Sequence, residues 1–143
     1  MTARSAALAR AAGQYWWTSG ALAELASLSL NAGRVDAADA LARESLRFAA
    51  QLHDRAGRVF GIGLLARVAA ERGQRERAGR LWGSIEHEDA GAPLGGWRRH
   101  RRECEERMGE TAGAEFERGR AAGRALTLDE AVGLALEQLD SRE

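Results

Sequence analysis

Apolar and small side chains recur along this chain at the three- and four-residue spacing of amphipathic helices. The first such segment runs from Trp17 to Asn31, and its apolar face consists of Leu22, Leu25, Ala26 and Ser29. After Gly33 a second stripe continues for four turns through Ala38, Leu41, Ala42, Ser45, Ala49 and Leu52. The pattern therefore predicts two consecutive helices separated by a glycine turn.

The next two segments repeat this arrangement. A helix is predicted from about Arg55 to Arg72, ending at Gly73, with an inward face made of Val59, Ile62, Leu65, Ala66 and Ala69. A fourth helix is predicted from Gln74 to Glu88, with Ala78, Leu81 and Ile85 inward. The stretch from Asp89 to Gly96 contains proline and three glycines, so it predicts a loop.

Three further helices are predicted after this loop. They run from Trp97 to Met108, from Ala112 to Ala122 and from Leu128 to about Leu139. The last one starts with a capping box, in which Thr127 caps the first turn and Glu130 reaches back. Alanine and leucine dominate the composition and β-branched residues are few, so the whole chain is expected to be all-α, without a sheet.

An offset of 40 residues aligns the chain with itself. It places Leu25-Ala26 on Leu65-Ala66, Gly33 on Gly73, Ala38 on Ala78 and Leu41 on Leu81. The aligned Leu-Ala pairs lie where a first helix packs closely, and the aligned glycines lie in the turn. The aligned alanine and leucine are the small and the larger apolar residue of a second helix. The repeat therefore predicts stacked helix hairpins. By the same offset Ala11-Ala12-Gly13 corresponds to Gln51-Leu52-His53, so the chain is expected to begin inside an earlier repeat.

Each hairpin resembles a tetratricopeptide repeat with a period lengthened from about 34 to 40 residues. The longer period and three segments resemble the carboxy-terminal repeat region of the MalT and LuxR-type ATPase regulators and related antibiotic-pathway regulators. The segments are Ala78-Gly79-Arg80-Leu81-Trp82-Gly83, Gly91-Ala92-Pro93-Leu94 and the run from Gly123 to Leu136. The predicted division is residues 1–15 as the end of a preceding repeat, 16–53 and 54–89 as two repeats, and 90–143 as a three-helix carboxy-terminal cap, all in a single domain.

This resemblance implies a non-catalytic protein-interaction or scaffold module, the sensor or scaffold segment of a bacterial transcriptional regulator. The ATPase site and the basic recognition helix of such regulators find no counterpart in this chain. The implied partner is a protein or peptide.

Composition excludes several classes of function. Every basic residue is arginine, so a lysine Schiff base and the lysine of a phosphate-binding P-loop are excluded. Cys104 is the single cysteine, so an internal disulfide and a C-x-x-C site are excluded, and a reducing cytoplasm is expected. The 21 basic and 21 acidic residues give no net charge, so direct nucleic-acid binding is not expected. No signal peptide or membrane-spanning run is found, so export and membrane association are not expected.

The first helix of each stacked hairpin lines the inner surface of such an array, where extended ligands bind. The predicted partner-binding residues on this surface are Ser27, Asn31, Phe60, Arg67 and Glu71. Arg67 is the expected anchor for a carboxylate of the partner.

Arg98, Arg99 and Arg102 belong to a dense arginine cluster at the start of a helix, and they form a candidate anion site. Glutamates follow four residues after Arg99, Arg101 and Arg102, so internal ion pairing is the simpler expectation.

The remaining candidates favour structural roles. Gly61-Ile62-Gly63-Leu64-Leu65-Ala66 matches a dinucleotide-binding motif, but it lies inside a predicted helix, where the glycines allow close helix packing. His100, Cys104 and Met108 share a helix face, and a core stripe of Trp97, Cys104 and Met108 is favoured over a metal site or a reactive thiol. The run from Glu86 to Asp89 is expected to be a solvated helix end. No catalytic residue, metal ligand or cofactor is predicted.

Two alternatives to a peptide-binding scaffold stay open. One is a small-molecule sensor with a pocket near Trp82 and Trp97 under the Pro93 loop. The other is a homodimer formed through Tyr15, Trp16 and Trp17, which otherwise fill the contact with a preceding repeat.

Overall fold

The computed structural model describes residues 18–92 and 97–137, and within these ranges the regular structure is entirely helical. The helices are residues 18–31, α2 Val35–Gln51, α3 Arg55–Glu71, α4 Arg75–Gly91, α5 Arg98–Thr111, α6 Ala114–Gly123 and α7 Leu128–Leu136. The all-α prediction is confirmed. Most helix ends agree with the sequence pattern, although α4 and α5 continue past their predicted ends at Glu88 and Met108, to Gly91 and Thr111.

The first four helices are joined by three short turns of the same geometry. Gly33 and Gly73 have positive φ angles of 78° and 74°, as predicted for turn glycines, and His53 adopts φ 52° at the turn between α2 and α3. The backbone N–H groups of Arg34, Asp54 and Gln74 donate to carbonyl groups five residues earlier at 2.8–2.9 Å. These bonds satisfy carbonyls at the end of each helix, so every turn ends one helix and starts the next.

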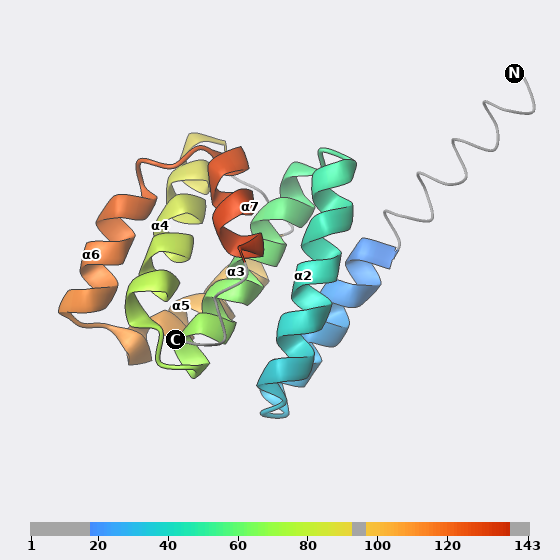
Figure 1. Cartoon of the computed structure of the whole chain (residues 1–143), viewed down its shortest axis with the longest axis horizontal. Coiled ribbons are helices and arrows are strands. Elements are labelled where there is room, and N and C mark those ends of the chain that lie inside the picture. Colours follow the sequence, from blue (N-terminus) through green and yellow to red (C-terminus); the bar gives the residue numbers. More distant parts are fainter. Residues whose placement is uncertain (1–17, 93–96, 138–143) are drawn as a thin grey trace, which may run out of the picture.

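Helices α2, α3 and α4 lie next to one another, and α3 is the central helix (Figure 1). Its residues from Gly61 to Ala69 are all buried, because α2, α4, α5 and α7 pack against α3. The alanines that the 40-residue offset aligns are also buried in both hairpins, since Ala26, Ala66, Ala38 and Ala78 have no exposed surface. Small side chains at these positions allow the helices to approach closely.

The three carboxy-terminal helices, predicted as a cap, pack at three different places on the array and do not form one block at its end. Helix α5 packs on α3 from one side, and α7 packs on α2, α3 and α4 from the opposite side (Figure 1). Helix α6 lies beside α4. The capping box at the start of α7 is confirmed: Thr127 Oγ1 accepts from Glu130 N at 3.1 Å, and Glu130 Oε1 accepts from Thr127 N at 3.0 Å.

Helices α4 and α6 contact each other through their backbones. A Cβ atom added at Gly79 of α4 would collide with the carbonyl oxygen of Phe116, and one added at Gly83 would collide with the carbonyl oxygen of Arg120. A Cβ atom added at Gly119 of α6 would collide with the carbonyl oxygen of Glu76. Because the contacts advance together along both helices, α4 and α6 run parallel. Glycines four residues apart on both helices make this approach possible, and they allow Cα–H groups to face carbonyl oxygens.

Candidate functional site

Arg67, the predicted anchor of the partner-binding strip, lies in the interior. It is only 4% exposed, its Nη2 donates to Asn31 Oδ1 at 3.0 Å, and its Nη1 lies 3.9 Å from Glu103 Oε2 on α5. Its Nε has no partner among the described residues. Arg67 therefore joins the helix 18–31, α3 and α5 to one another.

The other residues of the predicted strip also face α5 or the interior. Ser27 is buried, and Glu71 lies 3.7 Å from Arg107 of α5. Phe60 meets His100 edge-on at a ring-centre distance of 4.1 Å. Ser27 and Arg67 are therefore buried, whereas Asn31 and Glu71 are exposed. Helix α5 covers part of the predicted strip, and helical periodicity does not reveal which element covers a face.

The predicted anion site is exposed on α5. Arg98, Arg99 and Arg102 form no ion pair with any described residue. The internal pairing expected for Arg99 and Arg102 is therefore absent from the described part of the chain. Only Arg101 follows the expectation, since its Nε donates to Glu105 Oε1 at 2.8 Å.

The acidic run at the end of α4 forms ion pairs instead of a solvated end. Glu86 accepts two hydrogen bonds from Arg120 of α6 at 2.6 and 2.8 Å. Glu88 pairs with Arg55 of α3 at 2.6 Å, and Asp89 pairs with Arg101 of α5. Three carboxylates thus tie α4 to three different helices, and they do not converge on an acid–base centre.

The stripe of Trp97, Cys104 and Met108 is part of the core, as predicted. His100 is turned toward Phe60 and toward Glu24, whose Oε1 is 3.6 Å from its Nε2. Burial lowers the pKa of His100, which disfavours its charged form. Burial raises the pKa of the Cys104 thiol to about 12. A neutral thiol is a poor nucleophile and a poor metal ligand.

This raised pKa predicts a pH-dependent loss of stability. The contribution of the neutral Cys104 thiol to the free energy of unfolding is complete below the unfolded pKa of 9.0. It is lost as the pH rises toward about 12, because only the unfolded chain releases the thiol proton easily. Iodoacetamide at about pH 8 is expected to label Cys104 far more slowly in the folded chain than in urea. Equal labelling rates in the two states would contradict the burial of this thiol.

The dinucleotide-like run from Gly61 to Ala66 lies inside α3, with no strand before it among the described residues. A Cβ atom at Gly61 would lie 3.1 Å from the Cβ of Leu46, and one at Gly63 would collide with Trp97. These glycines therefore allow the helices to pack closely.

Trp82 and Trp97 are core residues, whereas Pro93 and the aromatic run from Tyr15 to Trp17 lie outside the described residues.

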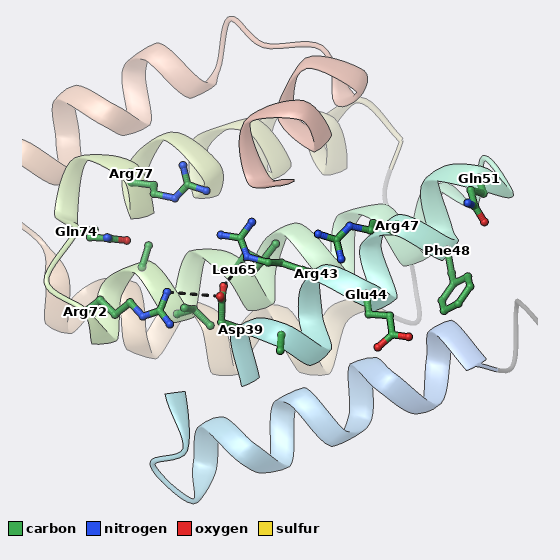
Figure 2. A pocket seen from close by; sticks show the side chains of 13 residues that line it. Asp39, Arg43, Glu44, Arg47, Phe48, Gln51, Leu65, Arg72, Gln74 and Arg77 are labelled. Carbon is green, nitrogen blue, oxygen red and sulfur yellow. Dashed lines mark hydrogen bonds and ion pairs between the residues drawn. The ribbon is translucent and has the colours of Figure 1, made fainter. Parts of the chain in front are cut away.

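An open groove of about 900 Å³ lies on the other side of α3, away from α5. Its residues come from α2, α3 and α4 and the turn before α4, namely Asp39, Ala40, Arg43, Glu44, Arg47, Phe48, Gln51, Leu65, Val68, Ala69, Arg72, Gln74 and Arg77. Three apolar residues of α3, Leu65, Val68 and Ala69, lie at its base but are only 1–3% exposed. The more accessible apolar residues of its lining are Ala40 and Phe48. Polar and charged side chains form most of its walls (Figure 2).

Arginines dominate the charged walls of this groove. Figure 2 shows Arg77, Arg43 and Arg47 following one another along it. Arg77 Nη2 donates to the carbonyl oxygens of Leu134 and Ala135 at 3.1 and 3.2 Å, so it caps the end of α7. Burial and the nearby Arg43 lower the pKa of Arg77, which indicates that the two guanidinium groups repel each other.

Aspartate 39 balances only part of this charge. Asp39 accepts from Arg43 Nε at 3.0 Å and lies 3.7 Å from Arg72 Nη1, while Arg47 is exposed and forms no ion pair with a described residue. The groove residues were not singled out from the sequence. The available signal was the pair Arg43 and Arg47, one turn apart on the polar side of α2.

Comparisons of this chain with protein-family models, with curated proteins and with solved structures give no match. Among the described residues, no helix has both the length and the apolar character that crossing a membrane requires.

Proposed function

We propose that this chain is a non-catalytic interaction module of the tetratricopeptide type that belongs to a bacterial transcriptional regulator as its sensor or scaffold segment. The repeated geometry of the hairpins supports this proposal. The turns at Gly33 and Gly73 have the same φ region and the same hydrogen bonds, and they lie 40 residues apart. The aligned alanines of both hairpins are buried. Arrays of this kind hold extended ligands on surfaces built from several helices.

The groove between α2 and α4 is the observation that carries the proposal. It is open to solvent, has Ala40 and Phe48 as accessible apolar residues, and is lined by side chains that donate and accept hydrogen bonds. Peptide sites combine these features, because accessible apolar residues contribute buried area while the polar walls fix orientation. On the opposite face of α3, α5 of the same chain packs over Phe60 and Arg67.

Selection from a displayed library of random peptides tests this function. Ala40 is exposed and lines the groove, so Ala40→Trp is expected to fill the groove without disturbing the core. Peptides enriched on the unmodified chain are expected to lose at least tenfold in affinity for Ala40→Trp, about 1.4 kcal/mol. The affinities are measured by fluorescence anisotropy.

Ala37→Trp is the matched control. Ala37 is exposed on the same helix but does not line the groove. The enriched peptides are expected to bind Ala37→Trp as they bind the unmodified chain. Enrichment of no peptide, or equal binding to both tryptophan variants, would contradict the proposal.

A further inference from the structure

The charge of the groove points to the chemistry of its ligand, and this inference rests on the proposed function. Four arginines and two carboxylates line the groove, and Asp36 outside the lining pairs with Arg72 at 2.7 Å, so a small excess of positive charge remains in a chain that carries no net charge. Arg43 and Arg77 are partly engaged, because they donate to carbonyl oxygens at and after the end of α7. Arg47 projects beside them with no ion pair to a described residue. A ligand carboxylate placed here would relieve the repulsion among these guanidinium groups.

The shape of the groove points to a helix as the ligand. Its α2 wall extends from Asp39 to Gln51, about 18 Å at 1.5 Å per residue, the length of a helix of about twelve residues. Helix α7 already packs on the same side of α3, and its buried residues Ala131, Val132 and Ala135 follow helical spacing. Helix α7 shows that a helix with an apolar face packs between α2 and α4, and the groove is the part of this side that remains open.

We infer that this groove binds an acidic amphipathic helix of a partner protein. The apolar side of that helix packs on Ala40, Phe48 and the aliphatic parts of the long side chains in the lining, and its carboxylates face Arg47 and the neighbouring arginines. Apolar contact supplies the buried area, while charge complementarity favours acidic partners and rejects basic ones.

The probe for this inference is the capped peptide ELEELLEELEEL, whose leucines have the spacing of one helix face. It is expected to bind the full chain with Kd of about 10–100 µM, because a short helix must also be ordered on binding. Binding is expected to weaken when NaCl rises from about 50 to about 500 mM. The lysine analogue KLKKLLKKLKKL, which keeps the apolar face, is expected not to bind.

Charge reversal at Arg47 gives the decisive comparison. Arg47→Glu is expected to weaken binding of the acidic peptide at least tenfold, and Arg47→Lys is expected to retain most of it. Arg118→Glu makes the same charge change at an exposed position of α6 that does not line the groove, and it is expected to leave affinity unchanged. Circular dichroism is used to check that all three variants remain folded.

Several results would overturn the inference. These are equal binding of the lysine analogue, equal weakening by Arg118→Glu and Arg47→Glu, or binding of the acidic peptide only after removal of residues 138–143, which would make the chain's own terminus the occupant. Failure here is distinguishable from failure of the proposed function. Library peptides that are neutral or basic and sensitive to Ala40→Trp would leave the function standing and reject the acidic ligand.

Discussion

Replacing Gly119 with alanine is expected to lower the free energy of unfolding by about 3 kcal/mol or more. The added Cβ would collide with the carbonyl oxygen of Glu76 and would lie 2.9 Å from the amide nitrogen of Arg80. Both are backbone atoms of α4, so no side chain can rotate away and the two helices must separate. The loss outweighs the gain in helix propensity of roughly 1 kcal/mol from glycine to alanine. Urea unfolding followed by circular dichroism measures the change.

Gly133→Ala is the matched control for this prediction. Gly133 lies within α7, is exposed, and has no atom within 4 Å of an added Cβ. The same substitution is therefore expected to stabilise the chain by about 0.5–1 kcal/mol. Equal effects at Gly119 and Gly133 would contradict the backbone contact between α4 and α6.

Leu65→Ala is expected to cost about 2–3 kcal/mol of stability. Leu65 is 3% exposed on the central helix, so its removal leaves a space that the surrounding helices fill only in part. The cost belongs to the lower part of the range for leucine because Leu65 borders the groove, where neighbouring side chains can relax. Thermal and urea unfolding provide the measurement.

The 40-residue repeat supplies the control for this prediction. Leu25 occupies the aligned position in the first hairpin and is 50% exposed, so Leu25→Ala is expected to cost less than about 0.5 kcal/mol. The aligned pair Leu28 and Val68 shows the same contrast, at 62% and 2% exposed. A cost of several kcal/mol for Leu25→Ala would mean that this face is covered in the folded chain.

The sequence predicted the candidate site only in part. It placed Asn31, Phe60, Arg67 and Glu71 on one face of the paired helices, because side-chain direction follows from helical periodicity. It did not predict that α5 would cover this face, since the contacts of Arg67 with Glu103 and of Glu71 with Arg107 join segments far apart in the chain. The groove was missed for the same reason, because its residues are drawn from three helices.

The sequence by itself determined the helices, the turns and the capping box, because these depend on residues only a few positions apart. Gly33 and Gly73 mark two turns, and Thr127 with Glu130 marks the start of α7. Tertiary structure decided which helix faces are covered. Leu25 and Leu65 have the same local pattern, yet one is exposed and the other buried, because burial depends on which distant helices pack against each hairpin.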